Sequence, residues 1–173
     1  MNDLLRFGLV SILVCLGGCS EFENLSYDLS RKPAGKVAIS VDLTDQHAYL
    51  FKGGQVVLTA PVSTGREGYN TPAGNYKVIQ KDIDHRSSIY GSYVREGMIV
   101  QENVDVRKDP RPPDSTFLGA PMPYFLRIRG GVGLHAGYLP GYPASHGCIR
   151  MPESKAIRFF ESAKVGTLVT IQR

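Results

Sequence analysis

Short runs that alternate apolar and polar residues, separated by glycine and proline, make up most of this chain. In residues 36–43, apolar side chains occupy every second position, which is typical of a strand with one buried face. The runs 48–52 and 55–62 flank Gly53-Gly54, a two-residue hairpin signal. Further strand-like runs occupy residues 76–80, 98–101, 125–128, 133–135 and 168–171. The pattern therefore predicts a chain that is mostly β.

Only residues 153–163 have the periodicity of a helix. Pro152 suits its first position, and an apolar stripe follows the helical period at Ala156, Ile157, Phe160 and Ala163. Residues 82–97 and 102–123 are predicted to be long loops, and loops of that size often form binding walls or lids. The expected fold class is mostly β with one helix, in a single-domain sandwich or distorted barrel.

The first twenty residues are typical of an export signal. Arg6 precedes an apolar run over residues 7–16, which is too short to span a membrane and fits a signal peptide. A buried first strand is the alternative, but it would need neither the cationic start nor the small residues that follow. The sequence Leu-Gly-Gly-Cys at 16–19 resembles a bacterial lipobox, which implies that Cys19 is lipidated. This predicts a signal peptide at 1–18, a tether at 19–35 and one domain at 36–173.

The formal net charge of +4 is spread along the chain rather than gathered in one block. The predicted signal peptide contains one acid, Asp3, and one base, Arg6, so its removal leaves this charge unchanged. No basic helix and no basic stripe interleaved with aromatic residues is present, which argues against a nucleic-acid partner.

Cys148 is the main candidate for a reactive residue in this sequence. Once the signal peptide is removed and Cys19 is acylated, Cys148 is the only free thiol left, and an unpaired cysteine in an exported protein is a candidate reactive group. His135 and His146 lie nearby in the sequence, and an adjacent imidazole is expected to keep a thiol largely as thiolate at neutral pH. Gly147 would let a substrate carbonyl approach the backbone closely.

The segment from Ser145 to Met151, Ser-His-Gly-Cys-Ile-Arg-Met, is preceded by Leu-His-Ala-Gly at 134–137 and resembles the signature of the L,D-transpeptidase (YkuD-like) catalytic domain. Residues 62–65 and 71–74 are similar to the Ser-Thr-Gly and Thr-Pro-x-Gly elements of the same family. The likeness covers about residues 36–171. His135 and Cys148 lie 13 positions apart, fewer than in many members, which we interpret as a trimmed loop.

The resemblance implies an enzyme of peptidoglycan. The family's cysteine attacks the carbonyl at the L-centre of the third stem-peptide residue, releases D-Ala and passes the acyl group to an amine on a second stem, giving a 3–3 cross-link. Members also attach lipoproteins to the wall, exchange D-amino acids or hydrolyse. Neither a metal nor an organic cofactor is implied. The implied partners are peptidoglycan stem peptides and, through acylated Cys19, a lipid membrane; Ser20 after the lipobox cysteine indicates an outer membrane, facing the periplasm.

The resemblance also implies roles for individual residues. Cys148 would be the nucleophile, and His135 the general base and later the acid for the departing amine. Backbone N–H groups of Gly147 and Cys148, with His146, would form the oxyanion hole, and the Ala136 carbonyl would fix the tautomer of His135. The remaining substrate-binding residues expected are Ser145, Arg150 and Tyr124.

Plainer interpretations remain open for each of these residues. Cys148 can be an inert core thiol, and His135, His146 and Cys148 can bind zinc, although a clear fourth ligand is missing. Arg150 can form a structural ion pair. The other two histidines, His47 and His85, are expected on the surface, and Tyr138 and Tyr142 in a packed loop.

Other functions remain open as well. A hydrolytic L,D-carboxypeptidase would use the same site, and a sortase-type transpeptidase also has His, Cys and Arg in this order. Sortases, however, have their histidine much further upstream and lack Ser-His-Gly-Cys. The third alternative is a non-catalytic lipoprotein that binds the cell wall through the same groove.

Overall fold

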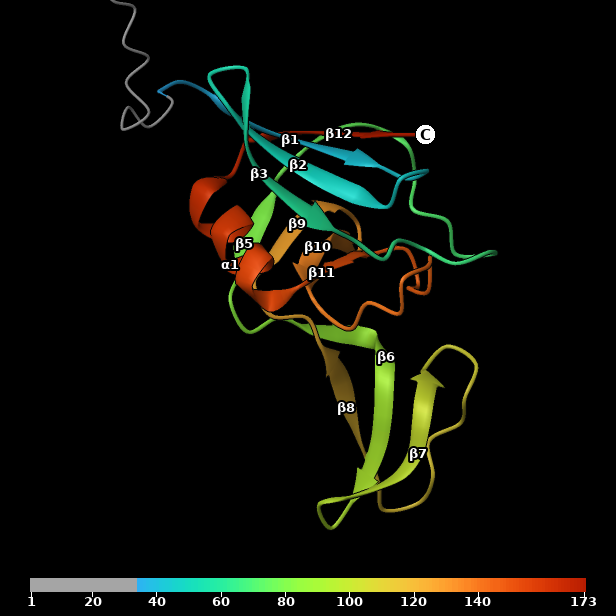
Figure 1. Cartoon of the computed structure of the whole chain (residues 1–173). Helices are drawn as coiled ribbons and strands as arrows, with labels where there is room; N and C mark the ends of the chain where they lie inside the picture. The colour runs from blue at the N-terminus through green and yellow to red at the C-terminus, as the bar shows by residue number, and fades with distance from the viewer. Residues whose placement is uncertain (1–33) are drawn as a thin grey trace, which may run out of the picture. The chain divides into compact units, whose positions relative to one another are not determined.

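The computed structural model describes residues 34–173, and its architecture is mostly β with one helix, as predicted (Figure 1). The predicted signal peptide, most of the tether and Cys19 lie outside the described residues. Residues Pro33–Arg173 form one compact unit. The elements are β1 (Val37–Asp42), β2 (His47–Lys52), β3 (Gln55–Pro61), β4 (Gly74–Lys77), β5 (Gln80–Asp82), β6 (Arg86–Arg95), β7 (Met98–Asp105), β8 (Thr116–Pro121), β9 (Phe125–Arg129), β10 (Val132–Ala136), β11 (Ile149–Met151), α1 (Glu153–Ser162) and β12 (Leu168–Gln172).

The strands form three sheets. The first has five strands in the order β3-β2-β1-β12-β4, the second has four in the order β11-β10-β9-β5, and the third has three in the order β7-β6-β8. The predicted hairpin joins β2 to β3, and its glycines have φ of 59° at Gly53 and 81° at Gly54, in the left-handed region that a two-residue turn requires. The C-terminal strand β12 pairs in parallel with β1.

The hydrophobic core is built from the first two sheets and α1. The alternating residues of β1 and β10 deliver Ile39, Val41 and Leu134 to it, each at most 2% exposed. Phe159 of α1 is fully buried, although the predicted apolar stripe did not include it. Within that stripe, Ala156 and Ala163 are buried, whereas Ile157 and Phe160 are only partly buried.

Two predictions of local structure were wrong by small margins. Pro152 is not the first helical residue but precedes it, in an extended conformation, and its carbonyl accepts the N–H groups of Lys155 and Ala156. The single strand predicted at residues 76–80 is divided into β4 and β5, because Val78 turns into the core between two sheets. The N–H of Val78 bonds Thr167, and the N–H of Ile79 bonds Arg127.

The two predicted long loops are in fact largely a third sheet. Residues 82–97 contain β6, and residues 102–123 contain the end of β7 and all of β8. Apolar and polar residues alternate only weakly in these segments. The pairings of β6 with β7 and with β8 both contain register shifts, and much of the sheet is exposed. This sheet extends away from the two core sheets in Figure 1.

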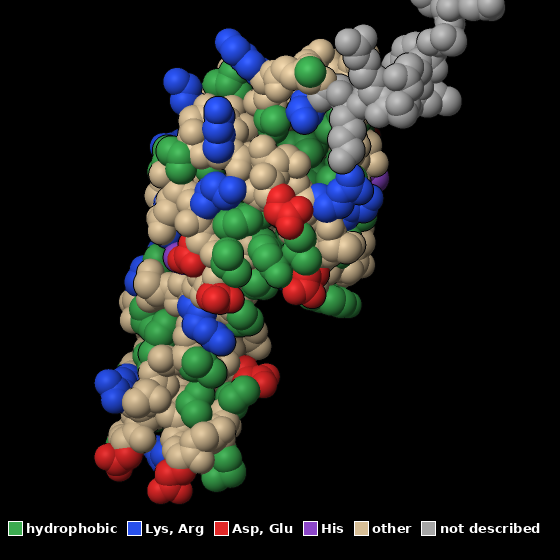
Figure 2. Space-filling view, turned by 90° about the vertical axis from the view of Figure 1, so that its left-hand side faces the viewer, with side chains coloured by type: hydrophobic (Ala, Val, Ile, Leu, Met, Phe, Trp, Pro, Cys, Tyr) green, Lys and Arg blue, Asp and Glu red, His purple; other side chains and the backbone are tan. Residues whose placement is uncertain are grey.

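Two properties of the described part bear on location and partners. No helix among residues 34–173 is long and apolar enough to cross a membrane. On the face drawn in Figure 2, Lys and Arg side chains are dispersed among Asp, Glu and apolar side chains. This agrees with the even spread of charge seen in the sequence.

Candidate active site

Strands β10 and β11 bring the signature residues together. They pair in parallel, with Leu134 opposite Ile149 and His135 opposite Arg150. Leu134 and Ile149 face the core, so alternation turns His135, Arg150 and the preceding Cys148 to the other face. There all three line one cavity of about 920 Å³, whose far wall is the β6–β8 sheet.

The His135 imidazole is prepared to accept a proton. The side chain is buried, at 5% exposure, and its Nδ1 lies 2.7 Å from the Ala136 carbonyl oxygen. A carbonyl only accepts hydrogen bonds, so Nδ1 carries the proton and Nε2 has the free lone pair. The contact has the geometry that the sequence analysis expected of Ala136.

The Cys148 thiol and the His135 imidazole are both neutral near pH 7. Burial lowers the pKa of His135 to about 4, with the charge of Arg150 acting in the same direction and the Ala136 hydrogen bond opposing it. Burial raises the pKa of Cys148. The thiol donates to the Gly131 carbonyl at 3.3 Å, and no thiol–imidazole hydrogen bond occurs within residues 34–173. The thiolate expected from the sequence is therefore absent at rest, and attack requires a base at the moment of reaction.

This arrangement predicts an unusual acid limit for the reaction of Cys148. His135 is in its basic form above a pKa of about 4, so acylation is expected to persist as the pH falls from 7 to about 5 and to decline only near 4. A histidine with the ordinary value would lose activity below about 6.5. Single-turnover acylation by a carbapenem, followed by mass spectrometry across this range, measures the limit. An acid limb near 6.5 in protein that remains folded would contradict it.

The turn before Cys148 is fixed by Ser145. Its buried hydroxyl donates to the Cys148 carbonyl at 2.6 Å and accepts the Gly147 N–H at 3.0 Å. Gly147 has φ of 111°, a conformation that side-chain-bearing residues rarely adopt. The Gly147 N–H expected in the oxyanion hole is thus already occupied. The N–H groups of His146 and Cys148 donate to no acceptor within the described chain and are the groups available for that role.

Thr71 is a buried residue that the sequence analysis did not single out for a role. Its hydroxyl accepts the Gly65 N–H at 2.9 Å and donates to the Gly147 carbonyl at 2.9 Å. Ser63 forms a backbone bridge with Arg150 on the same side. The Ser-Thr-Gly and Thr-Pro-x-Gly elements therefore act as the support on which the nucleophile turn rests.

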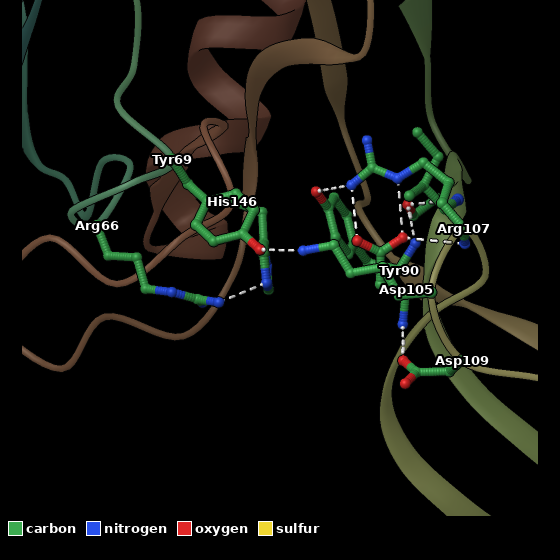
Figure 3. A network of polar contacts seen from close by, with 10 residues as sticks. Arg66, Tyr69, Tyr90, Asp105, Arg107, Asp109 and His146 are labelled. Carbon is green, nitrogen blue, oxygen red and sulfur yellow. Dashed lines mark hydrogen bonds and ion pairs between the residues drawn. The ribbon is translucent and has the colours of Figure 1, made fainter.

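His146 belongs to a separate cluster at the rim of the cavity, shown in Figure 3. Its Nε2 accepts a hydrogen bond from Arg66 at 2.8 Å. Its ring stacks on Tyr90, with centroids 4.0 Å apart, and meets the edge of Tyr69 at 4.7 Å. Burial, followed by the charge of Arg66, lowers the pKa of His146. The imidazole is thus committed to these neighbours, and only its backbone is available for the predicted oxyanion role.

Arg150 carries an uncompensated charge in the cavity. Its guanidinium donates to the Tyr138 carbonyl at 3.3 Å, and its pKa is lowered by burial. Within residues 34–173 a carboxylate contacts a basic side chain only in Asp82–His85 and Asp105–Arg107, so the structural ion pair considered for Arg150 is not formed. A half-buried cation without a carboxylate is a natural partner for an anionic ligand.

The structure corrects three expectations about surrounding residues. Tyr124 does not line the cavity; it packs edge-on against Phe160 of α1, at 5.9 Å between centroids. Tyr138 and Tyr142 are 76% and 61% exposed rather than packed. His85 is not a surface residue, because it lines the cavity with only 17% of its side chain exposed.

The zinc alternative finds no ligand set in the described chain. Among residues 34–173, no group of three or more His, Cys, Asp or Glu side chains is arranged to hold a metal ion. His135 and Cys148 instead bond the backbone carbonyls of Ala136 and Gly131, as described above.

Comparison with solved structures identifies the fold. An L,D-transpeptidase from Mycobacterium smegmatis matches with a TM-score of 0.59 at 19% identity, over 80% of this chain and 59% of that one, a likeness that shows the fold alone. The catalytic domain of an E. faecium L,D-transpeptidase, solved by NMR, matches with a TM-score of 0.57 at 29% identity, over 79% of this chain and 96% of that one. A mutant of an Enterococcus faecium L,D-transpeptidase matches with a TM-score of 0.55 at 26% identity, over 80% of this chain and 50% of that one. The chain therefore spans 50–59% of the longer relatives' length.

Comparison with family models gives the assignment. No curated protein sequence matches this chain. Residues 36–171 match the L,D-transpeptidase catalytic domain, YkuD, and this interval contains every strand and the helix described above except for the last residue of β12, Gln172. The chain belongs to the L,D-transpeptidase (YkuD) family.

Proposed function

We propose that this protein is a peptidoglycan L,D-transpeptidase with Cys148 as nucleophile and His135 as general base. The observation that carries the proposal is the shared cavity of these two residues, in which the Ala136 carbonyl leaves His135 Nε2 free to accept a proton. The family acts on peptidoglycan stem peptides in the cell envelope. The structural relatives that support the fold are L,D-transpeptidases by name.

In the first half-reaction, the thiol proton passes to His135 Nε2 as sulfur attacks the carbonyl of the third stem residue. The oxyanion that forms is stabilised by the N–H groups of His146 and Cys148, and losing one such donor typically costs about 10²–10³ in rate. The C–N bond to D-Ala then breaks, the amine takes the proton from imidazolium, and a thioester remains on Cys148. In the second half-reaction, an amine of another stem attacks the thioester, and the thiol is regenerated.

Arg150 explains why a tetrapeptide, rather than a pentapeptide, would be the donor. The departing D-Ala of a tetrapeptide has a free carboxylate next to the bond that breaks, whereas in a pentapeptide this group is an amide. Arg150 lies on the same sheet face as Cys148 and has only a neutral acceptor. We assign it to the terminal carboxylate of the donor.

The mature protein incubated with disaccharide-tetrapeptide is expected to release D-Ala and to form dimers linked between third residues, both read by mass spectrometry. Cys148→Ala should abolish both products, because no other side chain in the cavity supplies a thiol. Consumption of pentapeptide with tetrapeptide ignored would overturn the donor assignment.

The same experiment separates the remaining alternatives. Tripeptide without dimers would indicate a hydrolytic L,D-carboxypeptidase. A protein that only binds the wall would release no D-Ala and would not be acylated stoichiometrically by a carbapenem at Cys148.

The anchoring at Cys19 is proposed from sequence alone, since it lies outside the described residues. We assign the mature protein to the envelope, lipid-anchored at an outer membrane and facing the periplasm. Fatty-acid labelling of wild type and of Cys19→Ser tests this, and an unlabelled wild-type protein in the cytosol would refute it.

A further inference from the structure

A second histidine lies in the cavity with a carboxylate behind it. His85 lies between β5 and β6, and its Nδ1 is 3.0 Å from Asp82 Oδ2. Its ring stacks on the buried Phe125, with centroids 4.3 Å apart and planes inclined by 14°. The reaction described above uses neither His85 nor Asp82, yet this imidazole is fixed on a ring face and at one nitrogen.

The other nitrogen of His85 faces Arg127 of β9. Arg127 Nη2 lies 3.3 Å from His85 Nε2. Arginine has donors only, so Nε2 accepts, and the proton of the imidazole is on Nδ1, directed at Asp82. Asp82 therefore selects the tautomer of His85 that can bond Arg127. The Ala136 carbonyl selects the tautomer of His135 in the same way, by accepting the Nδ1–H hydrogen bond.

The Arg127 guanidinium is fixed on all sides by neutral groups. Its Nε donates to Gln80 Oε1 at 2.7 Å, and its Nη1 donates to the Gly130 carbonyl at 2.5 Å. Its planar end lies over the Phe125 ring, 5.1 Å from the centroid. No carboxylate lies within ion-pair distance of Arg127 in residues 34–173, so its charge stays uncompensated.

The same β9–β10 turn that Arg127 bonds also holds the nucleophile. The guanidinium donates to the carbonyl of Gly130, and the Cys148 thiol donates to the carbonyl of Gly131, the next residue. Arg127, Gly131 and Cys148 all line the cavity. Burial raises the pKa of Cys148, and the charges of Arg150 and, to a smaller extent, Arg127 oppose this rise, as nearby cations do for a thiol.

Other charged or titratable groups line the same cavity as Cys148. They include His135 on β10 and Arg150 on β11, and His85 lies behind Arg127. Arg150 already has a role toward substrate in the proposed reaction, and neutral His135 carries no charge near pH 7. Arg127 differs from both because its neighbours hold it in one position before substrate binds.

We propose that Asp82, His85 and Arg127 form a positioning relay for the nucleophile. Asp82 sets the tautomer of His85, His85 aligns Arg127, and Arg127 both fixes the Gly130–Gly131 turn and stabilises the Cys148 thiolate as it forms. The inference rests on the proposed function of Cys148 as nucleophile. Its test uses a small alkylating agent and no peptidoglycan, so failure of the relay and failure of the transpeptidase assignment give different results.

The experiment measures the rate of Cys148 alkylation by iodoacetamide against pH in the mature protein. Arg127→Gln is expected to move the midpoint of this profile upward by about one pH unit. The thiolate fraction at pH 7 then falls about tenfold while each thiolate becomes about threefold more nucleophilic, so the rate at pH 7 falls about threefold. Arg127→Lys, which retains the charge but not the planar fork, should give a smaller shift.

The relay itself is tested at His85. His85→Phe retains the stack on Phe125 and removes both hydrogen bonds, so its midpoint should rise in the same direction as that of Arg127→Gln. His85→Gln, whose amide can donate to Asp82 and accept from Arg127, should return the midpoint toward wild type. A purely structural role of His85 would not distinguish these two variants.

Arg129→Gln is the matched control, because it removes the same charge two residues along β9 from an exposed side chain without a hydrogen bond in the described chain. Its midpoint should be unchanged. An equal shift in Arg129→Gln, or no shift in both Arg127→Gln and His85→Phe, would overturn the proposal. Thermal unfolding identifies a variant that fails to fold, in which case the remaining variant decides.

Discussion

Replacing His135 by alanine is expected to slow acylation of Cys148 by about 10²–10⁴-fold, the range typical of a lost general base. The reason is that the thiol is neutral at rest and His135 Nε2 is the unprotonated nitrogen available in the cavity. Single-turnover acylation by a carbapenem, followed by mass spectrometry, measures the loss without requiring a peptidoglycan acceptor. Circular dichroism establishes that the variant is folded.

His146→Ala is the comparison that assigns the base. Its ring bonds Arg66 and stacks on Tyr90, and an aromatic pair contributes about 0.5–1.5 kcal/mol. Its removal should therefore weaken acylation by roughly tenfold or less and leave measurable turnover. If His146→Ala were instead the more severe of the two variants, the base would be His146.

Phe159→Ala should lower the free energy of unfolding by about 3–5 kcal/mol, the usual cost of removing a buried aromatic side chain. Phe159 is 0% exposed and belongs to α1, which packs against β10, the strand that carries His135. The free energy of unfolding of native proteins is about 5–15 kcal/mol in total, so the variant should be marginally stable. Urea unfolding followed by circular dichroism measures the change.

Arg158→Ala controls for the helix itself. Arg158 is the neighbouring residue and is exposed, so its replacement should change stability by about 0.5 kcal/mol or less. A loss below about 1 kcal/mol for Phe159→Ala would mean that the helix is not part of the cooperative core.

Most strands of the two core sheets could be predicted from local patterns. Alternation in residues 36–43 gave β1, and Gly53-Gly54 gave the first hairpin. Such patterns suffice because a strand with one buried face repeats every two residues, and a two-residue turn requires positive φ. Apart from residues 98–101 of β7, the β6–β8 sheet was missed for the converse reason, since its exposed faces and register shifts leave no regular alternation to detect.

The site was predictable only in part. The sequence by itself singled out Cys148, His135 and Arg150 as expected site residues, since the Ser-His-Gly-Cys-Ile-Arg-Met segment and the preceding Leu-His-Ala-Gly resemble one family's signature. The same resemblance implied the Ala136 contact, and the Ala136 carbonyl does lie 2.7 Å from His135 Nδ1. The expected position of Tyr124 in the groove was wrong, because its ring packs against Phe160 of α1 instead.

Only the tertiary structure decided which other side chains line the cavity or support the turn before Cys148. Arg127 meets a histidine 42 positions away at His85, Arg66 meets one 80 positions away at His146, and Thr71 bonds a carbonyl 76 positions away at Gly147. No local period encodes such contacts, because they depend on how separate sheets pack and on the path of the turns between them. The same packing decides the charge state of the nucleophile. Proximity in sequence predicted a thiolate beside an imidazole, but burial in the cavity keeps both groups neutral until the reaction begins.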